Sequence, residues 1–158
     1  EISCSLVGSE MCIRDSPTRR PLETSIMTDY KQLNALALAY VGDAIYETYV
    51  RDYLVREGQT RPNKLHHMAT HFVSAKAQAM LIQKMLDDGM LTEEEQGIYR
   101  RGRNAKSYTS AKNTNIMTYR MSTGFEALMG YLHLLERKER LEELIAWCLE
   151  KAGETNEG

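Results

Sequence analysis

The feature that most constrains this chain is a helical repeat of apolar residues in segment 33–49. Apolar side chains recur there at three- and four-residue spacing, at Leu33, Leu36, Ala37, Tyr40, Val41, Ala44, Ile45 and Tyr49. This spacing places them along one side of an α-helix. Asp29 and Gln32 can satisfy the free backbone groups at its start, and Gly58 marks its end. The pattern therefore predicts an amphipathic helix that starts near Asp29 and runs to about Val55.

Further helical segments follow, whereas strand signals are nearly absent. They are expected at about 62–86, 92–102, 123–135 and 137–152. Ser74 allows a bend in the first of them, and Thr92 with Glu95 offers a capping box for the next. The chain of 158 residues is long enough for one domain with a substantial core. The sequence therefore predicts an all-α domain.

The first 26 residues do not share this pattern. They hold two of the three cysteines and two of the three prolines, and they lack the basic and apolar regions of a secretory signal. Their segment SCSLVGSEMCIRDS resembles translated sequencing-adapter read-through. We expect a non-native or disordered leader at 1–26, a domain at 27–152 beginning with Met27, and a frayed tail at 153–158. A genuine mobile N-terminal arm is the alternative.

Composition argues against several classes of protein. No apolar run approaches the roughly 20 residues that cross a bilayer, so we expect no membrane-embedded segment. Three scattered cysteines do not make a disulfide framework or a zinc site, which favours a reducing cytoplasm. Cys148 lies among apolar residues and is expected to be buried.

Positive charge is concentrated in one window without acids. Residues 96–125 contain no Asp or Glu and six Lys or Arg, a charge of +6, whereas the rest has 14 cations and 22 acids, or −8. Such a segment suits a polyanion, because each phosphate contact releases condensed counterions. Asn104 and Ser107 are among the hydrogen-bond donors that it adds. A solvated loop with incidental charge is the alternative.

Asp43 is an unexpected acid within the apolar stretch LALAYVGDAIYE. On a helix it shares a face with Leu36, Ala39 and Val50. A carboxylate desolvated there is costly unless it binds a cation or several donors. Gly42 beside it leaves room for a ligand or a backbone to approach. A salt-bridged or partly exposed aspartate is the alternative.

Glu126 is the second candidate acid. Its spacing from Thr123 favours a capping box, in which the Glu126 carboxylate accepts from the Thr123 backbone N–H. Alternatively, Asp43 and Glu126 on two packed helices could hold Mg²⁺, which takes one or two carboxylates, waters and phosphate oxygens. His66, His67 and His71 lack the glutamate of the HExxH motif, so polar or nucleic-acid-facing histidines are favoured over zinc ligands.

Four stretches, in this order, resemble the Mini-ribonuclease III family, compact bacterial relatives of ribonuclease III that keep only the catalytic domain. They are LNALALAYVGDAIYETYVR, LHHMATHFVSAKAQA, YRRGRNAKS and KNTNIMTYRMSTGFEALMGYLHLL, within residues 29–151. The resemblance implies an all-α ribonuclease III fold and a cytoplasmic homodimer that cleaves double-stranded RNA. It implies that Asp43 and Glu126 are catalytic residues that bind Mg²⁺, with Mn²⁺ as an alternative.

The resemblance also implies how RNA is bound and which RNA it is. The expected RNA-binding residues are Arg100, Arg101, Arg103, Asn104, Lys106, Ser107 and Lys112, with Lys76 as a weaker candidate. The family's substrate is the duplex stem of precursor 23S ribosomal RNA, so the pre-ribosome and its proteins are further expected partners. Full-length ribonuclease III has additional acids where this chain has Leu36, Ala39 and Thr123. This sparse acid set motivates a rival hypothesis, a non-catalytic duplex-RNA-binding dimer. A helical interaction module without RNA affinity is a third, weaker hypothesis.

Overall fold

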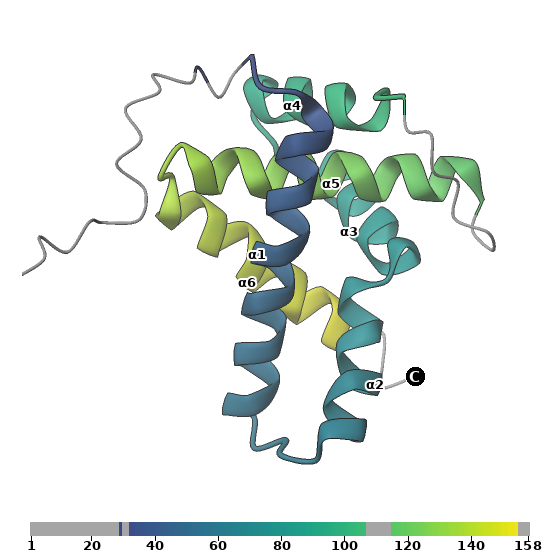
Figure 1. Cartoon of the computed structure of the whole chain (residues 1–158), viewed down its shortest axis with the longest axis vertical. Helices are drawn as coiled ribbons and strands as arrows, with labels where there is room; N and C mark the ends of the chain where they lie inside the picture. The colour runs from purple at the N-terminus through teal and green to yellow at the C-terminus, as the bar shows by residue number, and fades with distance from the viewer. Residues whose placement is uncertain (1–28, 30–31, 107–114, 155–158) are drawn as a thin grey trace, which may run out of the picture.

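The computed structural model describes residues 29, 32–106 and 115–154, and within these ranges all regular structure is helical. The helices are α1 (Ala35–Arg56), α2 (Pro62–Val73), α3 (Ala75–Asp87), α4 (Glu93–Arg103), α5 (Ile116–Leu134) and α6 (Lys138–Glu154) (Figure 1). The predicted all-α class is confirmed. The expected leader at 1–26, Ser107, Lys112 and the end of the tail lie outside the described residues.

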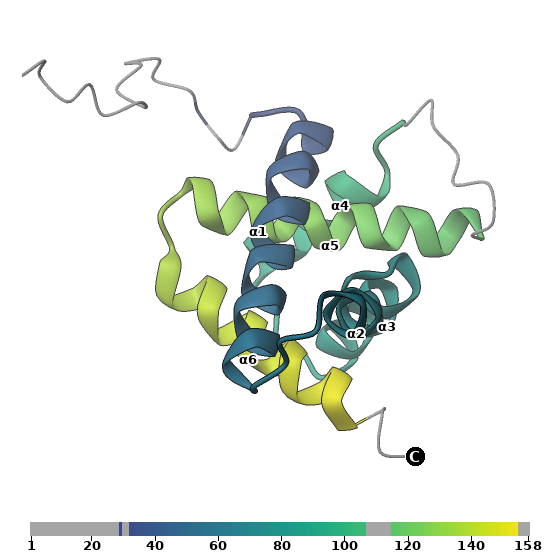
Figure 2. The same ribbon diagram turned by 60° about the horizontal axis from the view of Figure 1, so that its bottom comes forward.

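Helix α5 is the central element of the domain. Ten of its 19 residues are buried, which is the pattern of a helix packed on several sides. Helix α1 crosses it steeply, α3 and α4 pack against it, and α2 returns beside the second half of α1 (Figures 1 and 2). Where α1 meets α5, the Tyr46 and Phe125 rings pack edge to face at 4.9 Å, both fully buried. Burial of the Phe125 side chain contributes roughly 1.5–3 kcal/mol.

The predicted course of the first three helices is confirmed except at the start of α1. Helix α1 ends at Arg56, close to the predicted Val55, but it begins at Ala35 rather than near Asp29. Asn34 caps it by accepting a hydrogen bond from Leu36 N at 2.9 Å, while Gln32 donates to the Asp29 carbonyl in a separate turn. The region 62–86 is divided at Ser74, whose extended backbone separates α2 from α3.

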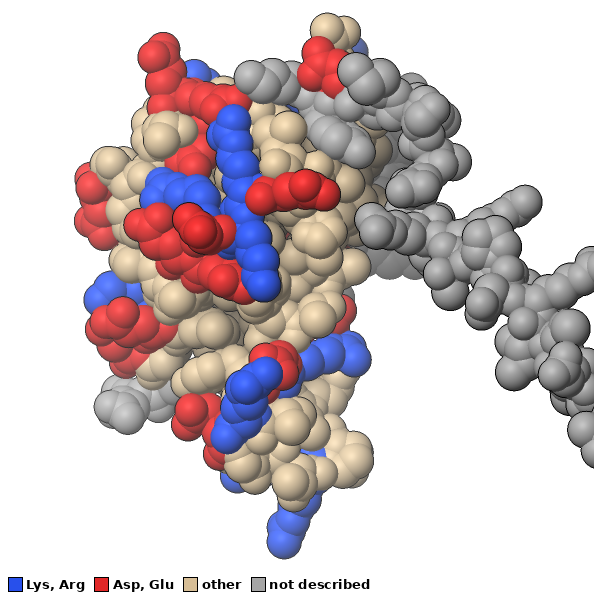
Figure 3. Space-filling model, turned by 90° about the vertical axis from the view of Figure 1, so that its left-hand side faces the viewer, with Lys and Arg blue, Asp and Glu red and all other residues tan. Residues whose placement is uncertain are grey.

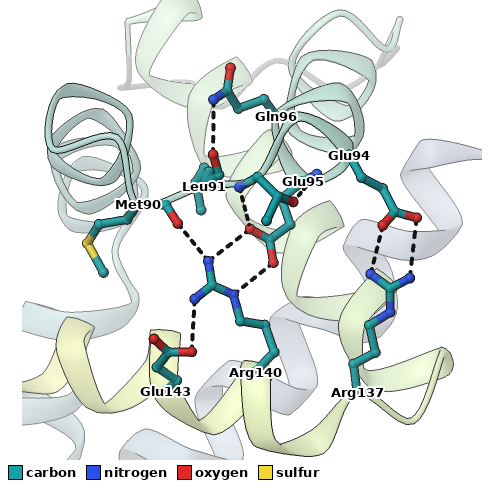
Figure 4. Close-up of polar contacts among 9 residues, drawn as sticks. Met90, Leu91, Glu94, Glu95, Gln96, Arg137, Arg140 and Glu143 are labelled. Atoms are coloured by element: carbon teal, nitrogen blue, oxygen red, sulfur yellow. Dashed lines mark hydrogen bonds and ion pairs between the residues drawn. The ribbon is translucent and has the colours of Figure 1, made fainter.

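The predicted capping box at Thr92 and Glu95 is present. Glu95 N donates to Thr92 Oγ1 at 3.2 Å, and Thr92 N donates to Glu95 Oε2 at 2.8 Å. The carboxylate of Glu95 also accepts two hydrogen bonds from the guanidinium of Arg140 on α6, with nitrogen–oxygen distances of 2.9 and 3.0 Å (Figure 4). Arg140 donates further to the Met90 carbonyl and to Glu143. These bonds fix the start of α4 to α6.

Two further predictions concern the burial of Cys148 and membrane-spanning segments. Cys148 is fully buried within the core, as expected. Within the described ranges, none of the helices combines the length and the apolarity that crossing a membrane requires.

Candidate active site

The backbones of α1 and α5 are in contact at Gly42 and Gly130. A Cβ atom on Gly42 would overlap the Glu126 carbonyl oxygen and lie 2.6 Å from Gly130 N. A Cβ atom on Gly130 would overlap the Leu38 carbonyl oxygen and lie 2.9 Å from Gly42 N. Two helices can approach this closely only where neither carries a side chain. Gly42 therefore clears space, as the sequence suggested, and the group that fills it is the backbone of α5.

This crossing brings the two predicted acids together. Asp43 follows Gly42 on α1, and the carbonyl of Glu126 is the group that faces Gly42 from α5. The Asp43 carboxylate is close enough for its charge to raise the pKa of Glu126. The crossing of α1 and α5 thus places the carboxylates of Asp43 and Glu126 near each other.

The predicted capping role of Glu126 is wrong. Helix α5 begins at Ile116, where Asn115 Oδ1 accepts a hydrogen bond from Met117 N at 2.9 Å. Thr123 consequently lies inside the helix, and its Oγ1 donates to the Tyr119 carbonyl at 3.0 Å. Residues 116–122 continue the helix toward the N-terminus, so the backbone N–H of Thr123 has no need of a cap. The Glu126 side chain is left for another role.

The environments of the two carboxylates differ. Asp43 is exposed in this single chain, which agrees with the partly exposed alternative given for it. Even so, packing around its carboxylate and then the charge of Glu47 raise its pKa. Glu126 is half-buried, and burial followed by the charge of Asp43 raises its pKa to about 8. Without a cation, Glu126 is therefore largely protonated at neutral pH.

Gln78 of α3 is a third polar group at this point, and the sequence reasoning missed it. Its side chain is 1% exposed, and neither Nε2 nor Oε1 has a hydrogen-bond partner. Its amide nevertheless lies near enough to Glu126 to oppose the rise of that pKa. A signal was present in the sequence, since Gln78 shares the core-facing side of its helix with Leu81, Ile82 and Met85.

The donor set fits a hard divalent cation. Two carboxylates are oxygen ligands, and Mg²⁺ commonly takes only one or two protein carboxylates beside waters and phosphate oxygens. Within the described ranges, no group of three or more His, Cys, Asp or Glu could hold a metal ion. The rings of His67 and His71 pack against each other at 5.2 Å, and both are exposed, as is His66. The favoured interpretation of these histidines as polar surface residues stays a prediction.

Some of the predicted RNA-binding side chains are exposed, whereas others already contact groups of the domain itself. Arg100, Asn104 and Lys106 are exposed at the end of α4, and Lys76 is exposed at the start of α3. Arg101 is half-buried and donates to the Leu33 carbonyl at 2.7 Å, which ties α4 to the start of α1.

Arg103 and the last turn of α4 lie against neighbouring groups. The Arg103 guanidinium lies 5.8 Å from the centre of the Tyr99 ring and donates to Asn104 at 3.3 Å. A Cβ atom on Gly102 would lie 2.7 Å from Ala127 Cβ, so this turn of α4 packs on α5 next to Glu126. The end of α4, which carries these cations, therefore packs on the part of α5 that contains Glu126.

Another face of the molecule has a different charge pattern. Seen from the left-hand side of Figure 1, where α5 turns into α6, acidic and basic side chains are interspersed (Figure 3). Ion pairs account for this mixture, among them Arg137–Glu94 at 2.8 Å and Lys138–Glu142 at 3.7 Å. A face of this kind does not favour a polyanion over other ligands.

Comparison with known proteins identifies the class to which this arrangement belongs. Residues 36–137 match the model of the ribonuclease III domain, and the matched range includes Asp43 and Glu126. A crystal structure of a Fusobacterium nucleatum protein superposes with a TM-score of 0.68 at 30% identity, covering 78% of this chain and 98% of that one. The described helices thus form the catalytic domain of an endoribonuclease of the ribonuclease III class.

Curated relatives narrow the class further. The chain is 72% identical over 131 residues to Mini-ribonuclease 3 of Enterococcus faecalis, covering 83% of this chain and 99% of the relative. It is 58% identical over 125 residues to Mini-ribonuclease 3 of Streptococcus pneumoniae, covering 79% of this chain and 98% of the relative. The chain belongs to the Mini-ribonuclease 3 family.

Proposed function

We propose that this endoribonuclease is Mg²⁺-dependent, acts in the cytoplasm as a homodimer on double-stranded RNA, and matures the ends of precursor 23S ribosomal RNA. The observation that supports its catalytic part is the pairing of Asp43 and Glu126 at the Gly42–Gly130 crossing. Two like charges at one point raise each other's free energy, and a divalent cation relieves this repulsion. Mn²⁺ is the expected alternative ion.

The roles of the two acids follow from their environments. When bound, Mg²⁺ would stabilise negative charge on the phosphodiester and lower the pKa of water. Asp43 is exposed and can meet both the ion and the RNA backbone. Glu126 loses a proton when it takes up the ion, because its pKa in the free chain is about 8. Cation uptake is therefore expected to strengthen as the pH rises toward that value.

RNA binding is assigned to the exposed cations near this site. Arg100 and Lys106 can contact phosphates, and Asn104 can donate to phosphate or ribose oxygens. Such contacts suit an A-form duplex, which proteins recognise by its shape, its phosphates and its 2′-hydroxyls. Arg101 is expected to contribute less than the sequence suggested, because it already holds the Leu33 carbonyl.

The homodimer is supported by exposed apolar side chains on the two helices that carry the acids. Tyr40 lies on α1 just before Gly42 and is 81% exposed, while Ile116 and Met117 at the start of α5 are 66% and 54% exposed. Large apolar side chains in such positions favour burial by a second molecule. Two copies of the site would allow both strands of a duplex to be cut.

The test is cleavage of a precursor 23S duplex stem with Mg²⁺, compared with EDTA. Asp43→Asn should reduce cleavage by roughly a thousandfold, the order expected when several kcal/mol of metal-ion catalysis are lost. Asp52→Asn is the matched control, because Asp52 lies on the same helix and pairs with the exposed Arg56 at 2.7 Å. Intact but bound RNA with the unaltered protein would favour the non-catalytic rival. Monomers in sedimentation would contradict the homodimer.

A further inference from the structure

Arg101 lies in the last turns of α4 beside the proposed RNA contacts, but its side chain is directed into the domain. Arg100 and Asn104 are four residues apart, so they share one face of α4, and both are exposed. Arg101 is turned by about 100° from Arg100 around the helix axis. It is half-buried, and its Nη2 donates to the Leu33 carbonyl oxygen at 2.7 Å. Its guanidinium is thus already bound within the domain.

The Leu33 carbonyl belongs to the segment that leads into α1. Asn34 is the N-cap of this helix and the first residue whose carbonyl takes part in its hydrogen bonds. Leu33 precedes that cap, and its side chain packs against the core. A guanidinium that donates to such a carbonyl makes a charge-assisted bond, which is stronger than a bond between neutral groups. Arg101 thus fastens the end of α4 to the start of α1.

The end of α4 consequently has two attachments, one to each helix that carries a proposed metal-binding acid. A Cβ atom on Gly102 would lie 2.7 Å from Ala127 Cβ, so the α4 backbone packs closely on α5. Arg101 supplies the attachment to α1. The start of α1 and α4 lie together at one end of the domain, at the top of Figure 1. Two attachments fix the direction in which the exposed face of α4 points, whereas contact with α5 alone would leave a rotation about that contact.

We propose that Arg101 is a positioning residue for RNA binding: through the Leu33 carbonyl it orients the end of α4, so that Arg100 and Asn104 meet the phosphates and ribose of the duplex. This inference rests on the proposed RNA-binding function. A cation that touches a phosphate releases counterions and contributes to the salt dependence of binding, whereas a cation that only positions others does not. The loss of Arg101 therefore weakens binding equally at every salt concentration.

The test is the affinity for a short RNA duplex, measured by fluorescence anisotropy in EDTA between about 50 and 200 mM salt. Arg100→Gln should reduce the slope of log affinity against log salt by about 1, as expected for one lost phosphate contact. Arg101→Gln should weaken binding by about tenfold throughout this range without changing the slope, a factor that corresponds to one charge-assisted hydrogen bond. Lys138→Gln is the control for the loss of a charge, because Lys138 pairs with Glu142 at 3.7 Å on the face with interspersed charges. It should leave affinity and slope unchanged.

Cleavage with Mg²⁺ and amide hydrogen exchange give two further readouts. Arg101→Gln should raise KM by more than it lowers kcat, whereas a variant that is merely less folded loses kcat with KM unchanged. The backbone amides of residues 36–38, which donate to Asn34, should exchange faster in Arg101→Gln than in the unaltered protein, but not in Arg100→Gln. Arg101→Lys keeps the charge and one donor, so it should be intermediate in affinity and in amide exchange, and it decides the matter if Arg101→Gln does not fold.

Several outcomes would overturn the proposal. A slope that falls by about 1 in Arg101→Gln would mean that Arg101 itself touches phosphate. Unchanged affinity or unchanged amide exchange in Arg101→Gln would mean that its bond to Leu33 does not orient the RNA contacts, as would full affinity of Arg101→Lys with faster exchange at the start of α1. If the unaltered protein does not bind duplex RNA, the proposed function fails, while hydrogen exchange still decides whether Arg101 holds the start of α1.

Discussion

Replacing Gly42 with alanine tests whether backbone contact between α1 and α5 builds the site. The new Cβ atom would overlap the Glu126 carbonyl oxygen and lie 2.6 Å from Gly130 N. Both obstacles are backbone atoms within a helix, so no side-chain rotation can relieve the overlap. The two helices would have to move apart, and Asp43 would move away from Glu126.

The size of the effect follows from two opposing contributions. Overpacking costs roughly 3 kcal/mol where the obstacle cannot rotate away, and replacing a helical glycine returns roughly 1 kcal/mol. Gly42→Ala should therefore lower the free energy of unfolding by about 2 kcal/mol. Gly97→Ala is the matched control, since Gly97 lies inside α4 and a Cβ atom added to it would meet nothing within 4 Å. That variant should gain roughly 1 kcal/mol, so the two should differ by about 3 kcal/mol.

Urea unfolding of both variants at one protein concentration measures this difference. The midpoints should be separated by roughly 1 M or more, with Gly42→Ala the lower. RNA cleavage by Gly42→Ala should also fall under conditions where the variant is folded, whereas Gly97→Ala should cleave normally. Equal stability of the two variants would refute the argument, because the overlap at the crossing would then cost nothing.

Two further predictions concern carboxylates with opposite pH dependence. The folded chain raises the pKa of Glu126 from 4.5 to about 8, so its stabilising contribution is full below about pH 4.5 and is lost as the pH rises toward 8. Glu126→Gln should abolish this loss when the free energy of unfolding is measured with urea and EDTA between about pH 5 and 9. If the stability of the variant falls with pH as steeply as that of the unaltered protein, the prediction is contradicted. Burial acts to raise the pKa of Glu95, but the hydrogen bonds from Arg140 and Thr92 outweigh burial, so the pKa is lowered. The stabilisation that Glu95 gives the fold is therefore present above pH 4.5 and is lost as the pH falls. Glu95→Ala should lower the free energy of unfolding by about 3 kcal/mol at about pH 7 and by less at about pH 3; equal losses at both would contradict this.

The helices of this fold were largely predictable because their periodicity is local. Capping signatures were less dependable, as two similar ones show. Thr92 with Glu95 starts α4, whereas Thr123 with Glu126 lies in the middle of α5. The two patterns differ in what precedes them, since Asn115 already caps a helix that contains Thr123. A capping box identifies side chains able to cap, but it does not show whether the helix has already begun.

The candidate site was predictable as far as its anomalies could be seen in the sequence. Asp43 stood out as a single acid in an apolar stretch, and Gly42 beside it indicated a close approach. Helical periodicity places Gln78 on the core-facing side of α3, but neither its missing hydrogen-bond partners nor the engagement of Arg101 could be found in this way. Whether an amide is paired, or an arginine already bound to a carbonyl, depends on which helices pack together. These are tertiary properties that no local pattern in the sequence contains.

The packing of this domain and its chemistry are connected through the Gly42–Gly130 crossing. Small residues let α1 and α5 approach closely, and this approach brings the exposed Asp43 next to the half-buried Glu126. The metal-free chain relieves the repulsion by keeping Glu126 protonated, so its stability declines as the pH approaches 8. A bound divalent cation would remove this cost, because it needs both carboxylates ionised. Stabilisation by Mg²⁺ should therefore be greatest at the pH values where the metal-free chain is weakest.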